Sequence, residues 1–251
     1  MGIRNIGLII SLDIKNFLMY RCWIISLIAM NLTDLVIFAV IFTNLVPIDY
    51  LRFFAPGLVV ISLFASAFSI GREVNWEIRS GLNDYLLSLP FRRLEIVLAR
   101  MISGGIRGLM YSFPFILLSL VLSKLPSLTE LIIIISMLFP LAAGIAGLSI
   151  GTAAIFKRFE AYIMFRSILY FALYFASSVF YPLEVIKRAF PVFVYLLAKY
   201  NPLSNGADLL RSILIGQPIF TFEMVSNILI FSFFFTMFGL LLYFLALIKG
   251  R

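Results

Sequence analysis

Residues 131–156 read LIIIISMLFPLAAGIAGLSIGTAAIF, an apolar run that contains no charged side chain. A helix needs about 20 mostly apolar residues to cross the hydrocarbon core of a bilayer. The whole 251-residue chain shares this character, because 63% of it is hydrophobic, 13% is charged and its mean hydropathy is +1.08. Soluble domains are about half apolar and a quarter charged. The composition therefore predicts an integral membrane protein.

Six such runs are expected to be transmembrane helices, separated by short polar or proline-bearing breaks. They lie at residues 22–46, 53–70, 102–122, 131–156, 162–181 and 225–248. We therefore expect one all-α, polytopic transmembrane domain that covers residues 1–251. The apolar stretch 190–198 is too short to span, and we expect it to be re-entrant or interfacial.

The positions of lysine and arginine predict the orientation of these spans. With the N-terminus inside, 14 of the 20 basic residues fall on the inner side and the other 6 on the outer side. Cytoplasmic loops carry such an excess of basic residues. We therefore expect both termini in the cytoplasm and the chain in the plasma membrane. The net charge of +8 then reflects orientation in the bilayer, and we expect no nucleic-acid partner.

The residue types exclude several kinds of chemistry. There is no histidine and only one cysteine, Cys22, so His-based catalysis, a multi-cysteine metal site and an intrachain disulfide are all excluded. Asp34 is the one acid well inside a predicted span, so it lacks the second carboxyl that aspartyl catalysis needs. The chain has no Gly-x-x-x-x-Gly-Lys-Ser/Thr phosphate loop. We expect no catalytic residue, metal or cofactor in this chain.

The N-terminal residues 1–21 show helical periodicity. Four isoleucines from Ile3 to Ile14 recur at helical spacing, while Lys15 lies elsewhere on the helical wheel. This pattern predicts an amphipathic helix in the cytoplasmic interface. The alternative is an extension of the first span, which Asp13 and Arg21 disfavour because they would enter hydrocarbon.

The cytoplasmic segment 72–93 contains a second short helix. Leu82, Tyr85, Leu86 and Leu89 fall at i, i+3, i+4 and i+7, which is one face of a helix. Pro90 ends it, and a turn is expected just before Leu82. A two-turn helix parallel to the membrane can be an interfacial anchor, or it can dock into the groove of a soluble partner. Composition alone leaves both open.

Asp34 is a candidate functional residue because intramembrane carboxyls are costly and usually functional. It would face the substrate path or a partner helix, close to Asn31. A structural hydrogen bond between packed helices is the alternative, and it is equally compatible with the sequence.

The outer segment 182–218 contains a possible ion pair and several helix breakers. Asp208 and Arg211 stand at i, i+3 on a predicted helix. They form a surface pair of little energetic value or, if that helix dips into the bilayer, a pair in low dielectric. Pro182, Pro191 and Pro202 divide the segment into short pieces, as re-entrant helices require.

Two series of residues carry a resemblance to a known family. The first runs Arg72-Glu73, Gly81-Leu82, Leu86-Leu87-Ser88-Leu89-Pro90-Phe91-Arg92-Arg93 and Val97-Leu98-Ala99-Arg100. The second runs Tyr181-Pro182-Leu183, Asn201-Pro202-Leu203 and Ala207-Asp208-Leu209-Leu210-Arg211. In this order the series resemble those of type-2 ABC exporter permeases, and the second is similar to the drug, nodulation-factor and polysaccharide export branch.

The resemblance implies a transport subunit that forms a path for an amphiphilic substrate. Two copies of a separate ATPase, which bind ATP and Mg²⁺, would dock on a cytoplasmic coupling helix, and a second permease chain would complete a homodimer. The implied docking residues are Glu73, Glu77, Arg79, Gly81, Leu82, Tyr85, Leu86, Leu89, Pro90, Arg92 and Arg93. The implied extracellular gate comprises Pro182, Asn201, Pro202, Asp208 and Arg211.

Two rival functions are considered. A secondary transporter or channel would work without an ATPase, but such transporters usually show paired inverted halves and polar residues at the bilayer midplane. An intramembrane enzyme would need a second carboxyl or histidine ligands, and the predicted spans supply neither.

Overall fold

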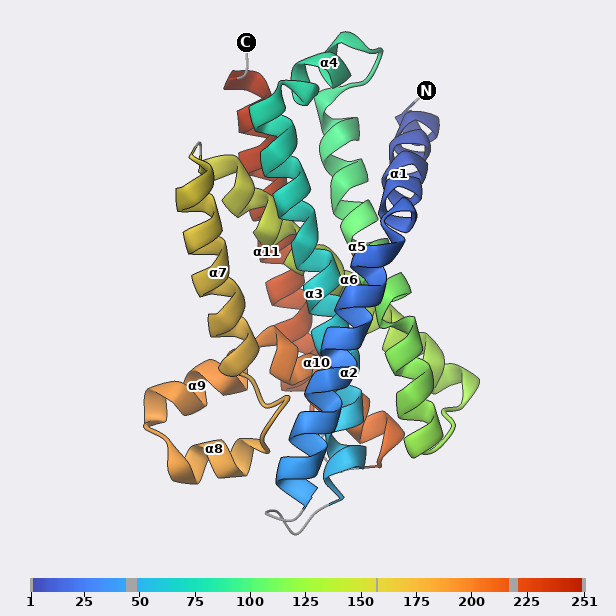
Figure 1. Ribbon diagram of the computed structural model, residues 1–251, viewed down its shortest axis with the longest axis vertical. Helices are drawn as coiled ribbons and strands as arrows, with labels where there is room; N and C mark the ends of the chain where they lie inside the picture. Colours follow the sequence, from blue (N-terminus) through green and yellow to red (C-terminus); the bar gives the residue numbers. More distant parts are fainter. Residues whose placement is uncertain (1, 44–48, 157, 217–220, 250–251) are drawn as a thin grey trace.

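The computed structural model describes residues 2–43, 49–156, 158–216 and 221–249, and every regular element in these ranges is an α-helix (Figure 1). The helices are α1 (Gly2–Met19), α2 (Arg21–Thr43), α3 (Tyr50–Ser80), α4 (Leu82–Ser88), α5 (Arg93–Leu122), α6 (Leu128–Ile155), α7 (Phe159–Phe175), α8 (Leu183–Ala189), α9 (Val192–Tyr200), α10 (Pro202–Leu214) and α11 (Phe222–Lys249). The prediction of an all-α chain is confirmed.

Five of the described helices are long and apolar enough to cross a membrane, namely α2, α3, α5, α6 and α11. Helix α7, in the place of the predicted span 162–181, has only 17 residues. At a rise of 1.5 Å per residue it is about 26 Å long, less than the roughly 30 Å of a bilayer core. It ends early because Ala176 leaves the helical region, with φ −83° and ψ 49°. Residues 44–46 of the first predicted span lie outside the described residues.

Helix α3 is the buried centre of the bundle. Its most apolar part is entirely enclosed, and α5, α6, α10 and α2 all pack against it. The predicted second span ends at residue 70, but α3 continues through residues 71–80 as one 31-residue helix. The charged residues of this extension point partly inward, where Glu77 is only 6% exposed. The extension is thus part of the bundle rather than an interfacial loop.

Helices α6 and α11 approach each other closely along a line of glycines. A Cβ atom at Gly144 would lie 2.6 Å from the Cα atom of Ser232, and a Cβ atom at Gly147 would overlap the backbone of Phe235. On α11, a Cβ atom at Gly239 would overlap Gly147 in the same way. Small residues at such contacts let two membrane helices pack backbone to backbone.

Helix α1 runs beside α5 and continues into α2 along the long axis of the bundle (Figure 1). The sequence predicted instead a helix lying in the interface, with its isoleucines on one apolar face. Ile3 is 90% exposed, while Ile9, Asp13 and Phe17 are the buried residues of α1. The difference arises because Asp13 has partners on α5 that draw this face of α1 into the bundle.

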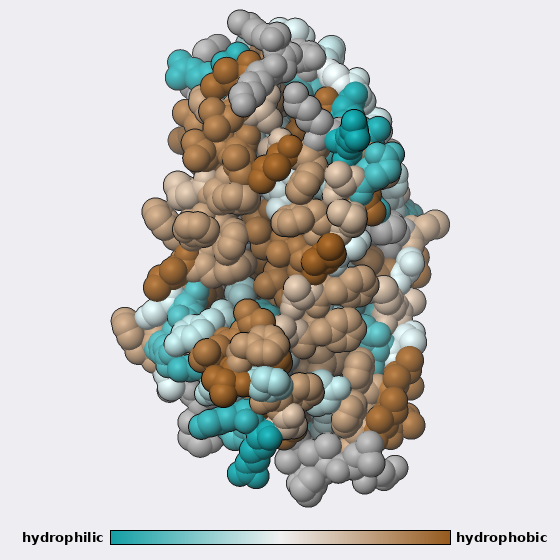
Figure 2. All heavy atoms as spheres, turned by 90° about the vertical axis from the view of Figure 1, so that its left-hand side faces the viewer, coloured by the Kyte–Doolittle hydropathy of each residue, from teal (hydrophilic) through white to brown (hydrophobic). Residues whose placement is uncertain are grey.

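The surface has an apolar middle. Figure 2 shows hydrophobic side chains covering the centre of the face that carries α7, with hydrophilic patches nearer the two ends of the molecule. One end holds α4, the Gly2 end of α1 and the Lys249 end of α11, and the other holds α8 and α9 (Figure 1). These are called the α4 end and the α8–α9 end below.

Candidate functional site

The segment between α3 and α5 folds into a short helix across the α4 end (Figure 1). Gly81 has a positive φ of 74°, and its N–H donates to the carbonyl oxygen of Glu77, which ends α3. Glycine adopts this left-handed conformation without steric cost. Helix α4 has seven residues, and Leu89 is extended before Pro90, as a residue that precedes proline prefers.

The apolar residues of α4 are divided between the interior and the surface. Leu86 and Leu87 are half-buried and pack against the core cluster that contains Val74 and Tyr243. Tyr85 points outward and is 62% exposed. Leu82 and Leu89, which share the predicted face with Leu86, are also half-buried. The leucines in and just after α4 therefore pack partly within the chain, and Tyr85 is the large side chain of α4 that is exposed.

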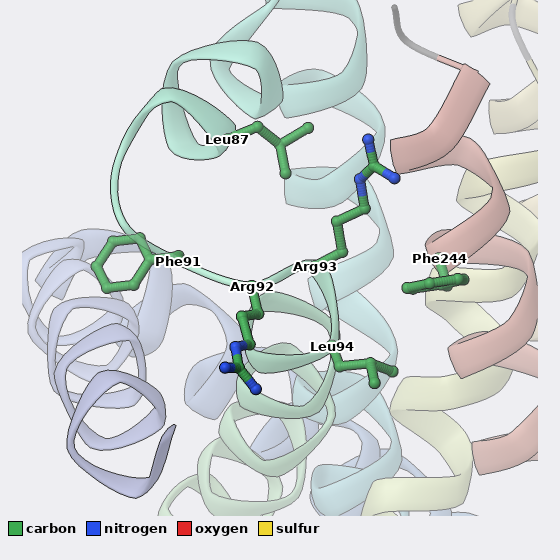
Figure 3. Close-up of a pocket in the computed structure, with 6 residues that line it drawn as sticks. All are labelled: Leu87, Phe91, Arg92, Arg93, Leu94 and Phe244. Carbon is green, nitrogen blue, oxygen red and sulfur yellow. The ribbon is translucent and has the colours of Figure 1, made fainter. Parts of the chain in front are cut away.

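A second exposed aromatic side chain, Trp76, lies one turn before the end of α3 and is 60% exposed. Beside α4 there is also an open cavity of about 430 Å³ (Figure 3). Four of its lining residues come from the turn before α5 and from the first residues of α5. The lining residues are Leu87, Phe91, Arg92, Arg93, Leu94 and Phe244. Two guanidinium groups thus stand next to apolar side chains. Phe244 lies on α11 across from Arg93 and Leu94, while the Arg92 side chain points away from it (Figure 3). This mixture suits a partner element that is apolar with acidic flanks.

Five charged residues, called the buried ion cluster below, join α1, α3 and α5 near the α4 end. They are Asp13, Glu73, Glu77, Arg100 and Arg107. The Arg100 guanidinium donates to the carboxylates of both Asp13 and Glu77. The Arg107 guanidinium donates to both carboxylate oxygens of Glu73, at 2.8 and 2.7 Å, and to the backbone carbonyl of Asp13 at 2.7 Å.

This cluster holds the three helices together, and four of its five members are buried. Asp13, Arg100 and Arg107 are all less than 7% exposed and Glu77 is 6% exposed, whereas the Glu73 side chain is 38% exposed. A buried charge that loses its partner costs about 3–5 kcal/mol, so the pairs of Arg100 with Asp13 and Glu77 resist separation of their helices. Arg107 also lies over the Phe17 ring, 5.2 Å from the centroid, which adds a contact to α1.

Two further hydrogen bonds connect the α4 region to the ends of the chain. The Tyr243 hydroxyl on α11 donates to the Asn83 side-chain oxygen on α4 at 3.1 Å. The Asn5 amide on α1 donates to the Glu95 carboxylate at 3.0 Å, and this carboxylate also accepts from the Arg92 N–H. Helix α4 is therefore fastened to α11, and the start of α5 is fastened to α1.

The predicted docking residues are placed at different depths. Tyr85, Pro90, Arg92, Arg79 and Gly81 are exposed. Leu82, Leu86, Leu89, Arg93 and Glu73 are half-buried, and Glu77 is buried. The guanidinium of Arg79 lies over the Phe159 ring at 4.9 Å. Glu77 is buried and Glu73 is half-buried because their carboxylates form ion pairs with Arg100 and Arg107 of α5.

The predicted outer pair, Asp208 and Arg211, lies on α10 and is buried. Arg211 is 0% exposed, and its guanidinium donates to the Asp208 carboxylate at 2.7 Å. It also donates to the backbone carbonyls of Phe53, Ser178 and Val179 at 2.8–3.0 Å. Of the two alternatives, an exposed surface pair is excluded, because both residues are buried. Arg211 joins α10 to α3 and to the segment after α7.

The other predicted gate residues occupy two places. Asn201 accepts a hydrogen bond from the Leu203 N–H and so caps α10, while its side-chain amide donates to backbone carbonyls at the end of α7. Pro202 is the first residue of α10, a position that suits proline. Pro182 stands apart from them, at the N-terminus of α8. Residues 217–218 of the predicted outer segment lie outside the described residues.

An exposed ion pair ties α9 to the start of α11. The Lys199 ammonium lies 2.9 Å from the Glu223 carboxylate. The hydrogen bond to this carboxylate raises the pKa of Lys199 above its ordinary value. Since both groups are accessible to water, the pair contributes little to stability.

The two predicted path residues of α2 face different neighbours. Asn31 is buried, and its amide donates to the Tyr111 hydroxyl on α5 at 3.1 Å. Asp34 accepts a hydrogen bond of 2.9 Å from the Tyr174 hydroxyl on α7. Asn31 therefore packs two helices together, whereas Asp34 is half-buried beside an opening between α2 and α7.

That opening, called the α2–α7 groove below, has a volume of about 520 Å³ and a floor formed by α3. Its lining residues are Leu27, Met30, Asp34, Phe38, Ala65, Ser69, Arg166, Ser167, Tyr170, Phe171, Tyr174 and Phe175. The sequence analysis missed the α7 side of this groove. Its signal was available, since Arg166, Tyr170 and Tyr174 recur every four residues and so share one face of a helix.

Comparison with known proteins identifies the family. The family model described as ABC-2 type transporter matches residues 7–215, which is most of the chain and runs from α1 to the end of α10. A search of the curated proteins finds no match. The match agrees with the all-helical bundle and its five helices of spanning length among the described residues. The chain therefore belongs to the ABC-2 type transporter family and is a multi-pass membrane permease subunit of an ABC transporter.

Proposed function

We propose that this permease exports an amphiphilic substrate and belongs to the drug, nodulation-factor and polysaccharide export branch. It works with a second copy of itself and with two copies of a separate ATPase, which bind ATP and Mg²⁺. The family match supports a permease subunit, and the series from Pro182 through Asn201 to Arg211 supports the branch.

The proposed topology has six spans, with α7 as the short fifth one, and places both termini in the cytoplasm of a plasma-membrane protein. The positions of the first and last helices support this, because Gly2 and Lys249 lie at the same end of the bundle (Figure 1). The excess of basic residues on that side, 14 against 6 of the 20, favours the cytoplasm for it.

The ATPase is proposed to dock at the α4 end. One observation carries this assignment: the α4 end exposes two large aromatic side chains, Trp76 near the end of α3 and Tyr85 on α4, and it also holds an open cavity that is lined by Arg92 and Arg93. Hot spots of protein interfaces are rich in tryptophan, tyrosine and arginine.

Movement of the ATPase pair is proposed to reach the spans through the buried ion cluster. Helix α4 follows α3 directly, and α3 is fastened to α5 and α1 by Arg100 and Arg107. A displacement of α4 therefore carries three helices with it, which is the kind of concerted change that alternating access needs. At the other end, helices α8–α10 with Pro182, Asn201, Pro202, Asp208 and Arg211 form the proposed extracellular gate, and Asn31 and Asp34 lie along the proposed path.

The test is co-purification of the ATPase with a variant of the exposed aromatic surface. Burial of one large apolar side chain contributes about 1.5–3 kcal/mol, so Tyr85→Asp should weaken docking by at least about tenfold. ATPase stimulation and transport should fall with it, while insertion into the membrane stays normal because no spanning helix is altered. Leu86→Asp is a poorer probe, because Leu86 also packs within the chain.

A matched control is Tyr200→Asp, which changes a tyrosine of 53% exposure at the α8–α9 end. It should retain the ATPase fully. If Tyr85→Asp binds the ATPase as well as wild type does, α4 is an interfacial anchor and the docking site lies elsewhere. If no ATPase accompanies the wild-type chain from its native membrane, a secondary transporter or channel becomes the better assignment.

A further inference from the structure

The α2–α7 groove contains a carboxylate that no basic side chain neutralises. Asp34 accepts one hydrogen bond from the Tyr174 hydroxyl. In the described part of the chain, no lysine or arginine lies within ion-pair distance of it. A carboxylate at mid-span is costly unless it is paired. A cationic group in the groove would supply that pair.

The same groove contains an arginine without an acidic partner. The Arg166 guanidinium lies over the Phe68 ring, 5.1 Å from the centroid. Its Nε atom is buried and has no hydrogen-bond partner among the described residues, and no ion pair of Arg166 occurs there either. Arg72 on α3 lies within electrostatic range of Arg166. This end of the groove is therefore suited to an anion.

Both charged side chains line the same groove and are related through one helix. Arg166 and Tyr174, the hydrogen-bond partner of Asp34, are eight residues, or about two turns, apart on α7. Tyr170 lies between them and within electrostatic range of both Asp34 and Arg166. The groove is thus negative beside the end of α7, where Tyr174 binds Asp34, and positive beside its middle, where Arg166 lies.

The remaining walls of the groove are apolar. Leu27, Met30 and Phe38 line it from α2, and Phe171 and Phe175 line it from α7. The volume of about 520 Å³ lies within the range of small-molecule sites. Such walls accept a hydrocarbon chain or ring system, and the aromatic faces near Asp34 also attract a quaternary ammonium group.

From these observations we propose that the α2–α7 groove binds zwitterionic amphiphiles. The cationic group of the ligand lies at Asp34, its anionic phosphate or carboxylate lies at Arg166, and its tail lies against the aromatic walls. A ligand of one charge leaves one of the two side chains unpaired, and an uncharged ligand leaves both. The inference names the substrate class of the proposed transport path and so rests on the proposed function.

The experiment compares four ligands that share an eight-carbon chain and differ in the charge of the head group. They are octylphosphocholine, octyltrimethylammonium, octyl phosphate and octyl glucoside, each below its critical micelle concentration. The full-length chain in dodecyl maltoside is titrated with each by calorimetry, with protein-free micelles as the blank. Octylphosphocholine should bind about tenfold more tightly than either singly charged ligand, and octyl glucoside most weakly.

Two variants assign the charges to the two side chains. Asp34→Asn should weaken the binding of octylphosphocholine and octyltrimethylammonium and leave the binding of octyl phosphate unchanged. Arg166→Gln should weaken the binding of octylphosphocholine and octyl phosphate and leave the binding of octyltrimethylammonium unchanged. The matched controls Asp49→Asn and Arg158→Gln, at exposed positions outside the groove, should bind all four ligands as wild type does.

Equal binding of the four ligands by the wild-type chain overturns the proposal, and this outcome needs no variant to fold. It would mean that the groove is an apolar contact for lipid or for a second copy of this chain. If both variants lose affinity for all four ligands equally, the proposal is overturned as well. The titration involves no ATPase, so its failure leaves the docking assignment intact, and loss of ATPase docking leaves the titration intact.

Discussion

Arg211 illustrates how a single arginine can fasten an irregular membrane segment. Its planar guanidinium meets three backbone carbonyls and the Asp208 carboxylate, and it lies 3.6 Å above the Phe53 ring. Backbone carbonyls left free after α7 ends need donors when they are buried, and Arg211 supplies them at Ser178 and Val179. Lysine has neither the geometry nor enough donors for this role.

We therefore expect Arg211→Gln to destabilise the protein by about 3 kcal/mol or more, because it leaves Asp208 buried and unpaired. Arg211→Lys should recover only part of this loss. Thermal unfolding in detergent measures both, with the exposed Arg188→Gln as a control that should stay within about 0.5 kcal/mol of wild type. An unfolding temperature of Arg211→Gln equal to that of the control would mean that the Arg211 contacts contribute nothing.

The burial and the partners of individual charged side chains were the features hardest to predict from the sequence. The i, i+3 spacing of Asp208 and Arg211 correctly predicts a pair, but spacing does not reveal burial. Glu73 and Glu77 look like residues of a solvated rim until the arginines that they contact on α5 are known. Their i, i+4 spacing was a usable signal of one helical face, but their partners lie more than twenty residues away in sequence.

At the scale of helices, apolar runs predicted that a helix is present better than they predicted where it begins and ends. The predicted span 131–156 corresponds closely to α6, because this run is bounded by a capping serine, Ser127, and by the charged residue Arg158. The predicted span 53–70 corresponds to only part of α3, because its charged extension is stabilised by contacts within the bundle. The early end of α7 had no clear signal, since residues 176–181 remain mostly apolar.

The contact of α6 and α11 gives a test at this scale. Gly147→Ala places a Cβ atom against the backbone of Phe235, which cannot move without separating the two helices. We expect a loss of about 1–3 kcal/mol or more, seen as a lower unfolding temperature in detergent. Gly7→Ala on α1 is the matched control, because a Cβ atom there meets nothing within 4 Å. Equal stability of the two variants would contradict the close approach of α6 and α11.

At the scale of the whole molecule, the class of protein and the family were predictable from the sequence. The composition predicted a membrane protein, and the two motif series predicted the permease family that the match to residues 7–215 confirms. The α2–α7 groove was not predictable, because it is made by three helices whose mutual placement the sequence does not state. The number of spans stays a prediction, since α7 is short.

The proposed topology can be tested with reporter fusions. A reporter after Arg251 should give a cytoplasmic signal, because most basic residues fall on that side of the six-span arrangement. A reporter between Glu184 and Lys199, in the region of α8 and α9, should give an external signal. A cytoplasmic signal from this second fusion would reject six spans and favour an arrangement in which α7 does not cross.

The unbroken length of α3 has a mechanical consequence. The helix carries one interior proline, Pro56, which lacks an N–H and weakens the helix locally, so bending concentrates there. About 9 Å of helix lies before Pro56 and about 36 Å after it. Helix α3 is then hinged at Pro56, so the long part can swing while the short part stays in place. A displacement of about 4 Å at Gly81 corresponds to a swing of about 6° of the long part, and it leaves in place the carbonyl of Phe53 that Arg211 holds.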